Sequence, residues 1–402
     1  MEDIGRRHTL PLQSPPEAII GCSSKSPLNA AERASARRLF YRIVEHFEVI
    51  SDRARHGPGS QTYSKPRLIR CTYEYTLSDE SRDLFLRSFF GALALPAFGD
   101  GTEGDGELEV DYEELMPLFD GFAECLMDKF FSASPVYDSA VLPAQDAGGS
   151  TPGSAGTTDR LASLRGACLV RDRYRCVITR KFDSSEHEIR YKQHGGNARD
   201  EDGALLHEQD PSQFDTLEVA HILPHSLTET NAQRTLDEPR QTALAILNML
   251  DNGVAHLING ADMDRPRNAL TLSALTLSAL TLSARLHEFF GAFNVYFDPV
   301  PGEPNTYRIQ SFLSPLMTRS IGCPVTRTLF VTANRTIEPP SARLLAVHRA
   351  IAHILHLSGA GNYIDTVLRD MDDCVVRSDG SSDLGRIVSL SLGGWLNSAV
   401  YS

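Results

Sequence analysis

The chain has 402 residues, which is long for one hydrophobic core and predicts two compact units with tails. Its formal net charge is −13 at pH 7, so any contact with nucleic acid requires a local basic patch. The seven cysteines form no Cys-x-x-Cys pair, which argues against a zinc ribbon or a disulfide framework. No segment is long and apolar enough to span a bilayer. Together these features predict an intracellular protein, nuclear or cytoplasmic.

The first third of the chain predicts a helical domain between two flexible segments. Residues 1–27 are rich in Pro, Ser and charge, which is typical of a disordered tail. Residues 28–132 are predicted to form a helical domain, because apolar residues recur at helical spacing in three segments: 29–49, 80–94 and 111–132. Residues 133–160 are small, polar and rich in Gly and Pro, which predicts a flexible linker.

The remaining chain mixes strand and helix signals. The stretch "TLEVAHILPHSL" (216–227) predicts a strand that ends in a turn at Pro224, and "VAHLING" (254–260) predicts a short strand. "FNVYF" and "TYRIQSF" flank "DPVPGEPN", a strand-turn-strand signal. Helices are predicted at 238–253 and 341–359. We therefore expect an α+β domain over residues 161–330, a helical extension over 331–375 and a tail over 376–402.

Three polar residues follow one another in an order that suggests a nuclease. His221 lies on the strand-like run "EVAHILP", Asn268 follows the turn in "DMDRPRNAL", and His287 opens the helical stretch "ARLHEFFG". With "CVIT", "NMLDNG" and "NVYF", these pieces resemble the HNH nucleases over about residues 161–313, in particular the branch common in fungi. The resemblance implies a ββα-metal fold, two strands and a helix around one divalent ion, embedded in the mixed domain.

The resemblance also implies roles for these residues. Cleavage of a phosphodiester requires a base for water and a cation for the developing charge. By the family pattern, His221 is the base, Asn268 steadies its imidazole or the ion, and His287 binds the metal. Mg²⁺ is the expected ion, with Mn²⁺, Zn²⁺ or Ni²⁺ as alternatives.

One position departs from that pattern. Many HNH proteins have a metal-binding Asp or His immediately before the first His, where this chain has Ala220. Glu218, two positions earlier, is expected on the same face of the strand as Ala220, and could supply a carboxylate directly or through water. His225 is expected in a surface turn and is an alternative ligand.

The pentapeptide ALTLS occurs three times between Asn268 and His287. The resemblance implies about nine residues between the Asn and the last His, and two surplus copies account for the additional ten. If the surplus extended the helix, it would carry His287 about 15 Å along the axis and break the site. If it looped out, the cost would be only about 1 kcal/mol. The repeat has neither strand nor helix periodicity, so both alternatives stay open.

Arginines supply the local basic patch that the acidic chain requires. Arg171, Arg173 and Arg175 lie in a basic stretch, and Arg265 and Arg267 flank Pro266 near Asn268. We expect these five residues to contact nucleic acid. For the basic stretch that contains Arg171, Arg173 and Arg175, an ordinary solvated surface is the alternative. The sequence thus favours a metal-dependent endonuclease acting on DNA. The alternative is an HNH-fold protein that binds nucleic acid or another protein without cleavage.

Overall fold

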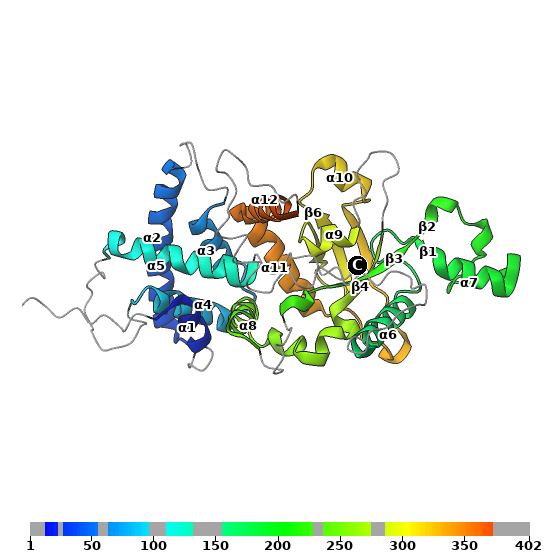
Figure 1. Cartoon of the computed structure of the whole chain (residues 1–402), viewed down its shortest axis with the longest axis horizontal. Helices are drawn as coiled ribbons and strands as arrows, with labels where there is room; N and C mark the ends of the chain where they lie inside the picture. The colour runs from blue at the N-terminus through cyan, green and yellow to red at the C-terminus, as the bar shows by residue number, and fades with distance from the viewer. Residues whose placement is uncertain are drawn as a thin grey trace, which may run out of the picture. The chain divides into compact units, whose positions relative to one another are not determined.

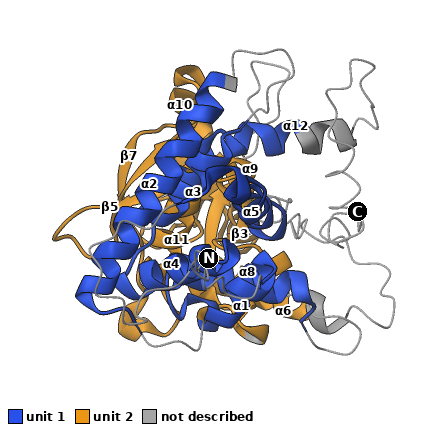
Figure 2. Cartoon of the chain, turned by 90° about the vertical axis from the view of Figure 1, so that its left-hand side faces the viewer, with its two compact units in different colours: residues 1–134, 229–256, 353–397 blue, residues 135–228, 257–352, 398–402 orange. Residues whose placement is uncertain are grey.

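The structure is a computed structural model that describes residues 13–22, 27–54, 63–95, 110–131, 155–227, 236–274 and 286–372. The chain divides into two compact units, each assembled from separated segments (Figure 2). The first comprises residues 1–134, 229–256 and 353–397, and the second comprises residues 135–228, 257–352 and 398–402. Within the described ranges, no helix combines the length and apolarity required to cross a membrane.

The first unit is helical. Its elements are α1 (Pro15–Gly21), α2 (Ala30–Ala54), α3 (Lys65–Glu74), α4 (Asp79–Ala92), α5 (Tyr112–Leu126), the π-helix η2 (Met127–Phe131), α8 (Glu238–Leu250), most of the 3-10 turn η7 (Val254–Leu257) and α12 (Ala360–Asp372). Helices predicted near 29–49, 80–94 and 111–132 are confirmed as α2, α4 and α5. Phenylalanines from these helices form the core, where Phe40, Phe89 and Phe119 are fully buried.

Helix α1 lies in the segment that the sequence predicted to be a disordered tail. The N–H of Ser14 donates to the Glu17 carboxylate at 2.9 Å, which fixes the first turn. Ala18 and Ile19 are buried, and the helix packs against α4 and α8. The prediction of disorder is therefore wrong for residues 15–21, which form a short amphipathic helix. The composition misled because the two apolar residues that become buried are surrounded by Pro and Ser.

The helix predicted at 238–253 is confirmed as α8, but it belongs to the first unit and packs there against α1, α4 and η2. Gly253, at φ +82°, follows its end in a conformation that favours glycine. The strand predicted at 254–260 is wrong, because Val254–Leu257 forms the 3-10 turn η7. The spacing of the apolar residues in "VAHL" fits a 3-10 turn as well as a strand, and Val254 and Ala255 are buried in the turn.

The second unit contains the mixed domain (Figure 1). Its helices and 3-10 turns are α6 (Ala155–Arg171), α7 (Ser184–His194), η3 (Gly195–Asn197), η4 (Leu206–Glu208), η5 (Pro211–Gln213), η6 (His225–Leu227), η8 (Gly260–Asp264), η9 (Pro266–Asn268), α9 (Leu286–Gly291), α10 (Pro315–Ser320) and η10 (Ala333–Arg335). Helix α11 (Ala342–Ser358) confirms the helix predicted at 341–359 and continues into the first unit. Residues 155–160 are helical in α6, which corrects the end of the predicted linker.

Three small sheets lie in this unit. β1 (Phe182–Asp183) pairs in parallel with β2 (Phe214–Asp215), and β3 (Leu217–His221) pairs antiparallel with β4 (Ala269–Ser273). The third sheet has the order β5 (Val295–Pro299), β6 (Thr306–Ser311) and β7 (Val325–Thr328). The predicted strand-turn-strand signal is confirmed by β5 and β6, which pair antiparallel. Helices and small sheets together agree with the α+β prediction.

Candidate functional site

The strand pair β3–β4 lies between two helices. On one face, Val219 of β3 and Ala269 of β4 pack against Leu164 and Cys168 of α6. Helix α9 packs against both strands. Neighbouring side chains of a strand point to opposite faces, so His221 shares the α6 side with Val219 and pairs directly with Ala269. This arrangement places the predicted His221 at the end of the ladder.

Asn268 fixes the chain immediately after His221. Its Oδ1 accepts from the N–H of Leu223 at 3.0 Å, and its Nδ2 donates to the carbonyls of Leu223 (3.2 Å) and Met263 (3.1 Å). The backbone carbonyl of Asn268 accepts from Ile222 at 2.7 Å. The amide is fully buried and engaged by these backbone groups, so Asn268 positions the strand end and the 260–268 segment and acts on His221 through the backbone.

His221 faces a carboxylate that the sequence did not single out. Its Nε2 lies 3.4 Å from Oδ1 of Asp264, and both side chains are only 6% exposed. Nε2 of His225 lies 4.0 Å from the same oxygen, and Nε of Arg160 lies 3.9 Å from Oδ2. The His221 contact is the main cause that holds the pKa of Asp264 below its usual value; burial opposes it, while His225 and Arg160 reinforce it.

The predicted metal ligands Glu218 and His287 meet on the other side of the strand pair. Oε2 of Glu218 contacts Nδ1 of His287, and the two side chains are 10% and 13% exposed. Glu218 comes from β3 and His287 from the second position of α9. The contact forms in spite of the ten surplus residues between Asn268 and His287.

This pair supplies donors that divalent ions use. A carboxylate oxygen suits Mg²⁺ and Mn²⁺, whereas an imidazole nitrogen suits Zn²⁺ and Ni²⁺, and Mg²⁺ commonly completes its shell with water and substrate phosphate. In the part of the chain that the structure describes, no three His, Cys, Asp or Glu side chains are grouped to hold a metal. The described residues thus offer two protein donors at this place, and a cation there would need water and phosphate as its other ligands.

The first copy of the ALTLS repeat is strand β4, whose five residues are all buried. The second copy begins at Ala274, whose N–H donates to the Thr216 carbonyl at 2.8 Å. Residues 275–285, which contain most of the two surplus copies, lie outside the described residues. Whether these copies form a helix or a loop therefore stays an open prediction. The contact between Glu218 and His287 nevertheless shows that the repeat does not keep α9 from the strands.

Arg171 has a structural place. Its guanidinium pairs with Asp172 at 2.8 Å, and neither side chain is exposed. Nη1 and Nη2 donate to the carbonyls of Pro266 (2.6 Å) and Ala269 (2.9 Å), which flank Asn268. Complete burial leaves no surface for a phosphate, so the expected nucleic-acid contact of Arg171 is corrected to a support for the Asn268 segment.

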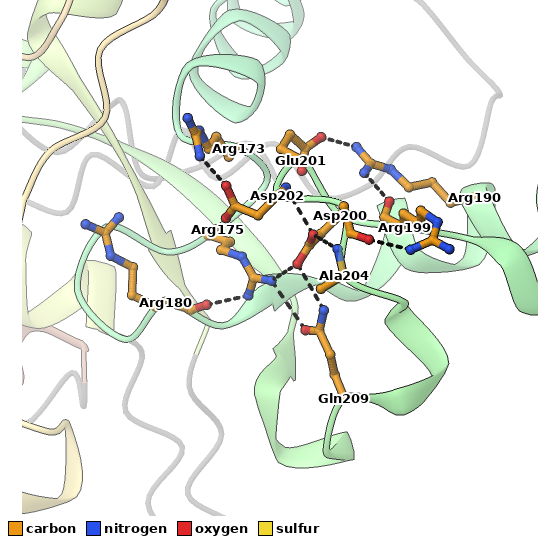
Figure 3. A network of polar contacts seen from close by, with 11 residues as sticks. Arg173, Arg175, Arg180, Arg190, Arg199, Asp200, Glu201, Asp202, Ala204 and Gln209 are labelled. Carbon is orange, nitrogen blue, oxygen red and sulfur yellow. Dashed lines mark hydrogen bonds and ion pairs between the residues drawn. The ribbon is translucent and has the colours of Figure 1, made fainter.

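Arg173 and Arg175 lie in a network of arginines and acidic residues (Figure 3). Arg173 pairs with Asp202 at 2.6 Å and is 43% exposed, whereas Arg175 pairs with Asp200 at 2.7 Å and is 15% exposed. Arg175 also donates to the Arg180 carbonyl at 2.9 Å. Acidic partners thus offset much of the charge in the predicted basic stretch, and Arg173 keeps the larger exposed surface of the two.

Arg265 and Arg267 lie beside the segment that carries Asp264 and Asn268. Nη1 of Arg265 and Nη2 of Arg267 each lie 3.2 Å from Oδ1 of Asp262. Glu338 is the second acidic partner of both. Their side chains are 47% and 20% exposed, so a phosphate could reach Arg265 more easily than Arg267.

Sequence comparison supports the resemblance over a shorter range. Residues 176–275 match the family model described as HNH endonuclease. The matched range contains Glu218, His221, Asp264 and Asn268, and it ends before His287. Searches of curated proteins and of solved structures found no match.

Proposed function

We propose that the protein is a metal-dependent endonuclease that hydrolyses phosphodiester bonds in DNA. The observation that carries the proposal is an antiparallel strand pair with a helix against it: His221 ends β3, Asn268 immediately precedes β4 and His287 lies on α9, in the order of the HNH pattern. The match of residues 176–275 to HNH endonucleases supports the same conclusion.

Each side chain has a chemical task in this proposal. His221 accepts the proton of the attacking water, for which a neutral imidazole is suited near neutral pH. Asn268 keeps the end of β3 in place by bonds to Leu223 and Met263. A divalent cation at Glu218 and His287 would offset the charge that develops on the phosphate and on the leaving oxygen.

Substrate contacts come from the segment next to the site. Arg265 is about half exposed and lies one residue after Asp264, so its guanidinium can pair with a DNA phosphate in place of one acidic partner. Arg173 offers a second exposed guanidinium on the same unit. These local charges act against a net charge of −13, so cleavage should weaken steeply with added salt.

The test is cleavage of supercoiled plasmid with Mg²⁺ or Mn²⁺. Wild-type protein should cleave, and His221→Ala should lose about 10²–10⁴-fold in rate because the base is missing. His194→Ala is the matched control. Because His194 is exposed at the end of α7, this variant should cleave at the wild-type rate. Cleavage by wild type and His221→Ala at equal rates would contradict the proposal.

The second candidate is an HNH-fold protein that binds nucleic acid without cleavage. Two observations favour it: Ala220 occupies the position of a common metal ligand, and the described residues contain no three-donor group. This candidate predicts that DNA binds in a gel-shift assay while no tested metal supports cleavage, and that His221→Ala leaves binding unchanged.

A further inference from the structure

Asp264 ends the 3-10 turn η8 with its carboxylate directed at His221. The side chain is 6% exposed, and Oδ1 lies 3.4 Å from Nε2 of His221. The segment is held from both ends, because Met263 accepts from the buried Asn268 amide and Arg265 donates its N–H to the Asp262 carbonyl at 3.3 Å. The position of the carboxylate is therefore built into the turn.

We propose that Asp264 is a positioning residue for His221: its carboxylate holds Nε2 and so turns Nδ1 toward the reacting water. A neutral imidazole has one N–H and one lone pair. With the N–H at Nε2 directed to the carboxylate, the lone pair is at Nδ1 and can accept the proton. The 3.4 Å contact is longer than an ordinary hydrogen bond, as catalytic contacts often are without substrate.

The groups around this pair favour an ionised carboxylate. His225 lies 4.0 Å from Oδ1, and Arg160 of α6 lies 3.9 Å from Oδ2. Both bring positive charge or a nitrogen donor to Asp264, and Ala269, opposite His221 on β4, brings no charge. An anion beside the ring also stabilises the imidazolium that forms when His221 accepts a proton.

The same turn contains a natural control. Asp262 is two residues earlier, and its carboxylate pairs with Arg265 and Arg267 at 3.2 Å. Asp262→Asn therefore removes an equal charge from the same short segment. Comparison of the two Asn variants separates the contact with His221 from a general change in charge or fold.

The test follows the titration of His221 by NMR of the full chain labelled in its histidine rings, with His221→Gln used to assign the signal. In Asp264→Asn the His221 signal should titrate at lower pH than in wild type, because the counter-charge is lost. Asp262→Asn should leave it unchanged, and Asp264→Glu should restore part of the wild-type behaviour. Equal titration of His221 in wild type and Asp264→Asn would overturn the proposal, and so would an equal shift in both Asn variants.

Kinetics give a second measurement that rests on the proposed function. With plasmid and Mg²⁺, Asp264→Asn should lower kcat by about tenfold or more, because the His221 ring is misplaced. KM should stay nearly unchanged, because Asp264 does not contact the substrate. The acid limb of kcat should move to lower pH. If wild type cleaves nothing, the proposed function fails and the NMR titration alone decides whether Asp264 positions His221.

Discussion

Strand β3 carries two imidazole–carboxylate pairs that differ in their surroundings. On the α6 side, His221 faces Asp264, whose carboxylate also has Arg160 and His225 nearby. On the α9 side, Glu218 contacts His287. The first carboxylate comes from a turn and is held ionised, whereas the second comes from the strand itself.

The difference is the basis for proposing different tasks for the two pairs. In the first pair Arg160 and His225 also lie within 4.0 Å of the Asp264 carboxylate, whose pKa is held below its usual value mainly by the His221 contact. In the second pair a nitrogen and an oxygen converge from two elements, which suits a shared cation. Glu218 and His221 are three residues apart, about 10 Å along the strand and on opposite faces, so the proposed cleavage requires the end of the strand pair to bring both pairs to one phosphate when DNA binds.

The largest expected effect separates the two pairs by their response to metal. His221→Ala should lose about 10²–10⁴-fold in cleavage rate at every Mn²⁺ concentration, because no ion replaces the base. His287→Ala should lose as much at low Mn²⁺ and recover part of the rate at high Mn²⁺. Plasmid cleavage across a Mn²⁺ titration measures both, and the same response from the two variants would remove the distinction.

Next in size is the support beneath the Asn268 segment. Arg171→Met should lower the free energy of unfolding by about 3–5 kcal/mol, because it leaves the buried Asp172 without its counter-charge. Arg173→Met is the control and should cost less than about 1 kcal/mol, since its pair with Asp202 is exposed. Urea unfolding of both variants checks this, and similar midpoints would contradict the structural assignment of Arg171.

A smaller, pH-dependent effect concerns α9. His348 is buried, stacks on Phe290 of α9 and has its Nε2 2.9 Å from the Phe290 carbonyl. Burial lowers its pKa from 6.5 to about 4. As pH falls from 6.5 to 4, the unfolded chain binds a proton that the folded state does not, so up to about 3 kcal/mol of stability is lost.

His348→Phe keeps the stacking and removes the titration. Its free energy of unfolding should therefore fall less between pH 6.5 and 4 than that of wild type, as measured by urea unfolding at several pH values. Parallel curves for the two proteins would show that His348 is not responsible.

The smallest effect is expected from the surplus repeat. Deletion of residues 274–283 leaves one ALTLS copy and restores the spacing of the HNH pattern. Since His287 already contacts Glu218, the deletion should change stability by about 1 kcal/mol or less and leave cleavage within a few-fold. A large gain in cleavage would indicate that the repeat impairs the site.

The sequence predicted the elements whose signals are local. The run before His221 reads as a strand, and the contact of Glu218 with His287 agrees with the expected face of that strand. The apolar pattern of 341–359 likewise predicted α11. Periodicity suffices in these cases because each element buries one continuous face.

Other features depend on contacts between distant segments. Nothing in "DMD" distinguishes Asp264 from Asp262, and only the path of η8 directs one carboxylate to His221 and the other to Arg265. Arg171 looked like its basic neighbours, yet the fold buries it under the Pro266–Ala269 backbone. The sequence offered one signal for Asp264: it lies in the segment "DMDRPRNAL", four residues before Asn268.

The most direct test of the two-pair account is the effect of Mn²⁺ on the histidine ring signals of the full chain. Bound Mn²⁺ broadens nearby nuclei, so the account predicts that substoichiometric Mn²⁺ broadens His287 first, while the buried His348 stays sharp. Glu218→Gln should abolish that selectivity. Broadening of His221 and His225 at Mn²⁺ levels that leave His287 sharp would contradict the account, because it would put the cation beside Asp264 instead.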